Sequence, residues 1–377
     1  MNIGFQRSMP LAEFPLWEKP KRIPFSFELE LTARCNNNCR HCCINLPAGD
    51  MMAREQELSF EEIKEIIDQA VSMGAIWCLI TGGEPLLRED FFSFYLYMKK
   101  KGLLVSVFTN ATLIGEEHVR LFQKYPPRDI EVTAYGATQE TYERVTRRNG
   151  SYVSFMKGFS LLLQNGIQVR LKAMALRSNV HEIPEIARFC REKTKDYFRL
   201  DPFLHLRYDR NAIRNEEIKS ERLSPEEIAA LERADPERLD ALRKSCGIQI
   251  AEDPPHLGCN HLFHCGAGND SFNVGYNGLF RLCPSLWHPD CVYDLKRGSL
   301  QDAWHTFVPA VRALRSNTRQ FLDKCCGCSL INLCMWCPGN AHLETGELDG
   351  AVEHFCRVAH ARAELCAIGA RASGSEE

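Results

Sequence analysis

The hydrophobic pattern of the first 204 residues changes repeatedly between two periods. Residues 25–31 alternate strictly between apolar and polar side chains, which is typical of a strand with one buried face. Ser59 and Glu62 then form a capping box, and the apolar residues after them recur at helical spacing until Gly74. The same patterns predict further strands at 75–81, 103–109, 130–134, 169–175 and 197–204, and helices at about 89–101, 115–124, 151–164 and 184–193.

Six strands that alternate with helices favour a parallel sheet covered by helices. A closed eight-fold barrel usually needs about 250 residues, more than residues 25–208 supply. We therefore predict an α/β fold in which 25–208 form a partial (β/α)6 TIM-like barrel. Residues 1–24 are then an N-terminal extension, 209–258 a charged helical connector and 367–377 a flexible tail. Chemistry in such folds lies at the C-terminal ends of the strands.

The cysteine content adds a second domain to this fold prediction. The chain has 377 residues and 18 cysteines, twelve of them in residues 246–377. A segment so rich in cysteine has a small apolar core for its length, so we expect metal to stabilise a second, α+β domain at 259–366. The net charge of −3, the absence of a long apolar run and the absence of a secretory signal predict no nucleic-acid partner, no membrane partner and a cytoplasmic location. In a reducing compartment these cysteines are not expected to form disulfides.

The first candidate site follows the first strand. Cys35, Cys39 and Cys42 have the spacing C-x3-C-x2-C, and three thiolates on one short loop can converge on one soft metal centre. A [4Fe–4S] cluster with three protein ligands keeps one iron open for another molecule. The alternative is a zinc site completed by His41 or Cys43.

The turn that ends the second strand reads Gly82-Gly83-Glu84-Pro85. Glycine permits close backbone approach, and Glu84 offers an anion to an ammonium group. Taken alone, the same four residues could be an ordinary tight turn.

The cysteine triad resembles the signature of the radical S-adenosylmethionine (radical SAM) superfamily, although His41 stands where an aromatic residue is usual. The resemblance implies that the open iron binds the amino and carboxylate groups of S-adenosylmethionine (AdoMet). One electron then cleaves AdoMet to a 5′-deoxyadenosyl radical that abstracts hydrogen from a substrate. The positions that resemble the family's AdoMet contacts are Gly82, Gly83, Glu84, Pro85, Asn110 and Thr133. For Asn110 and Thr133 the alternative is an ordinary polar residue at a strand end.

The C-terminal cysteines resemble the SPASM domain, an auxiliary-cluster module of radical SAM enzymes. One departure is the two-residue gap between Cys334 and Cys337, where three residues are usual. The resemblance implies two auxiliary [4Fe–4S] clusters, and so three clusters in all. The first would be held by Cys259, Cys265, Cys283 and Cys337, and the second by Cys325, Cys328, Cys334 and Cys356. Zinc knuckles are the alternative, and Cys326 or Cys43 could replace an assigned ligand.

The function implied by the resemblance is modification of a peptide or protein, such as a thioether, a carbon–carbon link or an oxidised residue. The auxiliary clusters would accept electrons or ligate the substrate, and a flavodoxin- or ferredoxin-type protein would supply electrons. Pro284 replaces the Asp of sulfatase-maturing members, which counts against their reaction. Little chain precedes Phe25, so we expect a separate leader-binding protein or the barrel itself to bind any leader. The alternatives are a small-molecule radical SAM oxidoreductase and a non-catalytic, metal-stabilised binding protein.

Overall fold

The structure is a computed structural model, and it describes residues 22–194, 198–250 and 260–372. The chain divides into two compact units. The first comprises residues 1–221, 266–284 and 291–309, and the second comprises residues 222–265, 285–290 and 310–377. Part of the segment expected to form the separate cysteine-rich domain therefore packs with the first unit. Among the described residues, no helix combines the length and apolar character needed to cross a bilayer.

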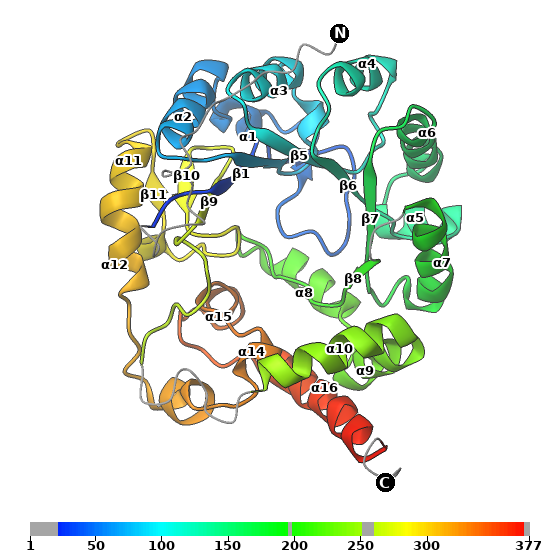
Figure 1. The fold of residues 1–377 in the computed structure, drawn as a ribbon, viewed down its shortest axis with the longest axis vertical. Coiled ribbons are helices and arrows are strands. Elements are labelled where there is room, and N and C mark those ends of the chain that lie inside the picture. The colour runs from blue at the N-terminus through cyan, green and yellow to red at the C-terminus, as the bar shows by residue number, and fades with distance from the viewer. Residues whose placement is uncertain (1–21, 195–197, 251–259, 373–377) are drawn as a thin grey trace. The chain divides into compact units, whose positions relative to one another are not determined.

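The first unit is built on six parallel strands that neighbour one another in chain order (Figure 1). They are β1 (Ser26–Glu30), β4 (Trp77–Thr81), β5 (Leu104–Thr109), β6 (Asp129–Thr133), β7 (Val169–Met174) and β8 (Arg199–Asp201). The helices between them are α2 (Phe60–Ser72), α3 (Phe91–Lys100), α4 (Glu116–Lys124), α5 (Gln139–Thr146), α6 (Ser151–Gln164) and α7 (Ile183–Lys193). This arrangement confirms the predicted partial (β/α)6 barrel.

Local sequence explains these elements. At the start of α2 the predicted capping box is present: the Glu62 carboxylate accepts from the Ser59 N–H at 2.8 Å, and the Ser59 hydroxyl accepts from the Glu62 N–H at 3.3 Å. In β7, Leu171 and Ala173 are buried, whereas Arg170 and Lys172 lie on the other face of the strand. β7 therefore turns its charged side chains to one face of the sheet and its apolar side chains to the other.

A hairpin from the C-terminal half of the chain extends this sheet beyond β1. Its strands are β9 (Ser271–Val274), β10 (Leu279–Arg281) and β11 (Tyr293–Asp294). β9 pairs in parallel with β1, and β10 pairs antiparallel with β9 across a turn at 275–278. Gly278 has φ +86° in this turn, a conformation that favours glycine. The fully buried Arg281 donates to Glu30 of β1 at 2.9 Å and thus ties the hairpin to the barrel.

The second unit is mainly helical. Its longer helices are α9 (Pro225–Ala234), α10 (Pro236–Gln249), α15 (Pro338–Thr345) and α16 (Glu353–Ala372). α9, α10 and α16 pack together, and buried Glu232 accepts from both Arg238 at 2.9 Å and Arg362 at 2.7 Å. A disulfide joins Cys246 of α10 to Cys366 of α16. The expectation that the cysteines form no disulfides is therefore wrong for this pair, because packing of the two helices brings their Cα atoms to 6.5 Å.

Several short elements complete the chain. They are β2 (Arg34–Cys35), β3 (Leu46–Pro47), α1 (Met51–Gln56), α8 (Ala212–Glu221), α11 (Leu300–Asp302), α12 (Val308–Arg312), α13 (Arg319–Phe321) and α14 (Ile331–Cys334). Of these, β2 and β3 form a small parallel pair that frames the first cysteine loop.

Candidate metal centres and cofactor cavity

The loop that carries the cysteine triad is held by backbone contacts. Cys35 ends β2, and the N–H groups of Asn38 and Arg40 donate to carbonyls at the end of α5, at 2.9 and 3.2 Å. Arg214 of α8 donates to the carbonyl of Cys39 at 2.9 Å. These contacts fix the loop without using its thiols, which remain available for a metal centre.

A cavity of about 170 Å³ lies at the C-terminal ends of the strands, next to this loop. The structure brings most of the predicted site together there: the lining includes Cys35, Cys39, Cys42, Gly82, Gly83, Asn110 and Thr133. Thr109, next to Asn110, lies there too, and the lining also includes residues that the sequence analysis did not place at the AdoMet site: Asn37, Asn45, Thr81, Phe108, Glu131, Tyr135 and Lys172. Alternation along β5, β6 and β7 explains Phe108, Glu131 and Lys172, because inward positions recur every second residue.

Glu84 and Pro85 are not among the lining residues. The fully buried Glu84 carboxylate accepts from the Thr109 hydroxyl at 2.7 Å, the Asn110 N–H at 2.7 Å and the Leu86 N–H at 3.1 Å. Burial raises the pKa of Glu84 to about 7. Its carboxylate thus accepts from groups at the end of β5, and the contact of Glu84 with the ammonium group of AdoMet stays a prediction.

The two glycines of the turn pack against the chain segment that leads into the cysteine loop. A Cβ on Gly83 would lie 2.3 Å from the Arg34 carbonyl oxygen and 2.5 Å from that of Ala33. Gly82 has φ +131°, and its Cβ would lie 2.3 Å from the Thr32 carbonyl oxygen. The close approach predicted for these glycines is therefore an approach to the protein's own backbone, beside Cys35.

The donor set fits a thiolate-held cluster. Burial raises the pKa of Cys35 to about 12 and that of Cys39 above its usual range, so loading with iron must release protons from these thiols. The Cys35 Sγ already accepts from the N–H of Asn37 at 3.4 Å and lies 3.7 Å from the Asn110 Nδ2. Across the described parts of the chain, no three His, Cys, Asp or Glu side chains are preformed to hold a single metal ion.

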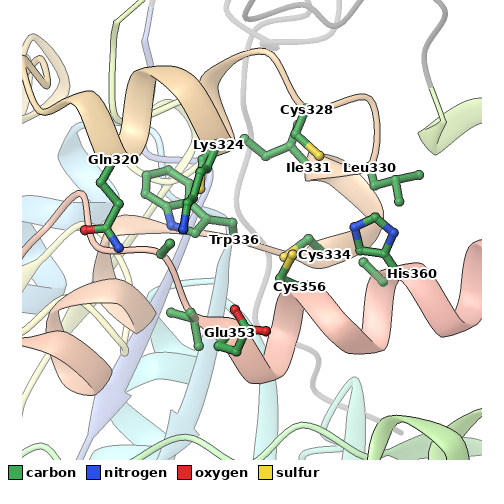
Figure 2. A pocket seen from close by; sticks show the side chains of 14 residues that line it. Gln320, Lys324, Cys328, Leu330, Ile331, Cys334, Trp336, Glu353, Cys356 and His360 are labelled. Atoms are coloured by element: carbon green, nitrogen blue, oxygen red, sulfur yellow. The ribbon is translucent and has the colours of Figure 1, made fainter.

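A second cavity, of about 220 Å³, lies within the second unit (Figure 2). All four cysteines assigned to the second auxiliary cluster line it: Cys325, Cys328, Cys334 and Cys356. Figure 2 shows Cys328, Cys334 and Cys356 around this cavity, from the turn before α14, from α14 and from α16. Burial, reinforced by the other three thiols, raises the pKa of Cys334 to about 12. Cys326 is buried and is not among the lining residues.

The first auxiliary site is less complete. Cys265 and Cys337 both lie in the second unit; burial raises the pKa of Cys337 to about 11, and the charge of Cys265 adds to this rise. Cys283 belongs to the first unit, where it lines a cavity of about 190 Å³ with Glu28. Cys259 lies outside the described residues. The four-cysteine set for this cluster therefore stays a prediction.

Comparison with known families agrees with this geometry. Residues 29–190 match the model of the radical SAM superfamily. This segment is therefore a radical SAM domain, and a cysteine-rich C-terminal region follows it in the sequence. Members of this superfamily bind AdoMet and an iron–sulfur cluster, which the cysteine cavity of the first unit suits.

Two curated proteins and one solved structure illustrate what the chain is similar to. The chain is 30% identical over 167 residues to an AdoMet-dependent heme synthase of Methanosarcina barkeri, covering 43% of this chain and 46% of the relative. It is 29% identical over 181 residues to the subtilosin biosynthesis protein AlbA of Bacillus subtilis, covering 48% and 38%. The chain thus spans less than half of these relatives. The fold is like that of Streptococcus suis SuiB bound to the precursor peptide SuiA, with a TM-score of 0.65 at 16% identity over 89% of this chain and 76% of SuiB.

Proposed function

We propose that this chain is a radical SAM enzyme that modifies a peptide or protein substrate. Reductive cleavage of bound AdoMet would supply a 5′-deoxyadenosyl radical, which abstracts a hydrogen atom from the substrate. The observation that carries the proposal is the single cavity shared by the Cys35–Cys39–Cys42 loop and the Gly82–Gly83 turn. The three thiolates would hold the cluster, and the backbone of the turn would face AdoMet, together with the side chains of Asn110 and Thr133.

Other residues of the cavity would position the substrate and exclude water. Lys172 and Glu131 form an ion pair on neighbouring strands, and the Lys172 Nζ lies 4.2 Å from the centre of the Phe108 ring. Burial lowers the pKa of Lys172, and Glu131 opposes this effect. A paired, largely buried cation of this kind adds polarity without adding net charge. Phe108 and Tyr135 give the cavity aromatic walls, which suit a site that must shield a radical from solvent.

We further propose three [4Fe–4S] clusters. The four thiols around the cavity in Figure 2 would ligate every iron of the second auxiliary cluster, which leaves no iron open and favours electron transfer. Cys259, Cys265, Cys283 and Cys337 would hold the first auxiliary cluster. Anaerobic reconstitution followed by metal analysis tests this: three clusters require about 12 iron and about 12 sulfide per chain. About 4 iron together with stoichiometric zinc would contradict the two auxiliary clusters.

A peptide substrate is supported by relatives whose names or structures involve peptides. AlbA is named for bacteriocin biosynthesis, and SuiB was solved with a precursor peptide. A small-molecule substrate is the second candidate, because the heme synthase of M. barkeri is 30% identical over 167 residues, close to the 29% over 181 residues for AlbA. In either case we propose a flavodoxin- or ferredoxin-type electron donor, and for a peptide also a separate leader-binding protein.

The test uses the reconstituted full-length chain with AdoMet and dithionite. Wild type should form 5′-deoxyadenosine, Cys39→Ser should not, and Cys190→Ser should behave as wild type because Cys190 is a buried residue of α7 outside both cavities. A short peptide encoded beside the gene and iron coproporphyrin are then offered in parallel, and products are followed by mass spectrometry. A mass change in the porphyrin with none in the peptide would favour the second candidate. Equal 5′-deoxyadenosine from wild type and Cys39→Ser would contradict both.

A further inference from the structure

Asn37 has an unusual position within the cysteine loop. It lies between Cys35 and Cys39 and lines the same cavity as the three thiols. Its exposed fraction is 4%, and both its Oδ1 and its Nδ2 are buried without a hydrogen-bond partner in the described structure. Buried polar side chains in folded proteins are nearly always hydrogen-bonded. The partner of this carboxamide is therefore expected to arrive with the contents of the cavity.

The neighbouring carboxamides do not share this property. Asn36 donates to Thr112 at 2.8 Å and accepts from Asn110 at 2.8 Å. The Asn45 Oδ1 accepts from Arg207 at 3.1 Å. Asn37 thus has an unused N–H donor in a wall where the other amides are already committed.

The local chemistry favours sulfur as the acceptor. The backbone N–H of Asn37 donates to the Cys35 Sγ at 3.4 Å, so the residue lies next to one of the three thiols. Its side chain emerges between the first and second cysteines of the triad. Hydrogen bonds to cluster sulfurs are a main means by which proteins set the reduction potential, because they stabilise the more negative, reduced form.

We propose that the Asn37 Nδ2 donates a hydrogen bond to a sulfur of the bound cluster and makes that cluster easier to reduce. Asn37 is in this sense a positioning and tuning residue, and it transfers neither electrons nor protons. The inference rests on the proposed function, because it requires a cluster on the Cys35–Cys39–Cys42 loop. Its consequence is that the carboxamide favours delivery of an electron to the site of AdoMet cleavage.

The experiment compares Asn37→Leu with Asn38→Leu, a matched control one residue along the loop whose side chain is exposed. The reconstituted full-length proteins are poised at one potential without AdoMet, and the reduced cluster is counted by EPR as the signal absent from Cys39→Ser. In Asn37→Leu the ratio of reduced to oxidised cluster should fall about fivefold, the effect of one hydrogen bond. The ratio in Asn38→Leu should stay at the wild-type value.

An unchanged ratio in Asn37→Leu would overturn the inference. A lost AdoMet affinity with an unchanged ratio would do so as well, by assigning the amide to AdoMet. If Asn37→Leu fails to load iron, Asn37→Asp replaces it, since it keeps the shape and removes the donor, and its ratio of reduced to oxidised cluster should fall at least as far.

Independently of any variant, pulsed EPR of wild type labelled with ¹⁵N in asparagine side chains should show nitrogen coupling to the reduced cluster, and its absence would refute the inference. Failure of wild type to load iron would instead refute the proposed function.

Discussion

Replacement of Gly83 by alanine tests the packing of the glycine turn against the cysteine loop. The new Cβ would lie 2.3 Å from the Arg34 carbonyl oxygen, 0.7 Å short of the 3.0 Å below which real Cβ contacts essentially do not occur. A second backbone oxygen, on Ala33, lies at 2.5 Å, so no side-chain rotation relieves the overlap. The chain before Cys35 must move, and the hydrogen bond from the Glu84 N–H to the Arg34 carbonyl, now 2.8 Å, must lengthen.

Overpacking of this kind destabilises proteins by about 1–3 kcal/mol, and contact with two backbone atoms places Gly83→Ala near 3 kcal/mol. Displacement of Cys35 should also impair the first cluster, with loss of about 4 iron per chain. Denaturant unfolding and iron analysis measure the two effects. Gly49→Ala is the control, because its Cβ would meet no atom within 4 Å. If Gly83→Ala matched Gly49→Ala in both stability and iron content, the role assigned to the turn would be refuted.

Three further predictions concern other parts of the molecule. Cys334→Ser should lose about 4 iron per chain by metal analysis while 5′-deoxyadenosine formation persists, and full retention of iron would contradict its assignment. The pKa of Glu84 is about 7 in the folded protein, above the ordinary value of 4.5 expected for the unfolded chain. Protonation of Glu84 therefore adds stability that is fully present below pH 4.5 and is lost as the pH rises through 7. Wild type should therefore lose about 2–3 kcal/mol relative to Glu84→Gln between pH 5 and pH 8 in denaturant unfolding, and parallel curves for the two proteins would argue against this. Reduction of the Cys246–Cys366 disulfide should destabilise the chain by about 2–4 kcal/mol, and Cys246→Ser should abolish the response of the unfolding midpoint to reductant.

The sequence predicted elements whose signals are local. The capping box of α2 and the apolar alternation of the barrel strands act within a few residues, so six strands and five helices could be placed from them. α5 was missed because it is only eight residues long and its apolar positions are few. Yet the last carbonyls of α5 accept hydrogen bonds from the cysteine loop. The helix with the weakest sequence pattern therefore holds the loop that carries the thiols.

Features that depend on distant segments could not be predicted in the same way. Cysteine spacing did predict which thiols line the two cavities, because those residues are chemically distinctive, and their role as cluster ligands stays a prediction. The sequence alone could not single out Asn37. Its carboxamide is distinctive only because the folded chain buries it without a hydrogen-bond partner. The disulfide between Cys246 and Cys366 likewise joins residues 120 positions apart, and only the packing of two helices brings them together.

The pairing of β9 with β1 has a consequence for biosynthesis. Ser271 of β9 pairs with Ser26 of β1, 245 residues earlier in the chain. A ribosome adding roughly 5–20 residues per second needs roughly 12–50 s to make that interval. Throughout this time β1 presents an open edge, with unpaired backbone groups that can capture a strand of another chain. During this interval the edge of a nascent barrel is open to pairing with strands of other chains. A barrel made without β9 would keep the unpaired backbone groups of β1 permanently.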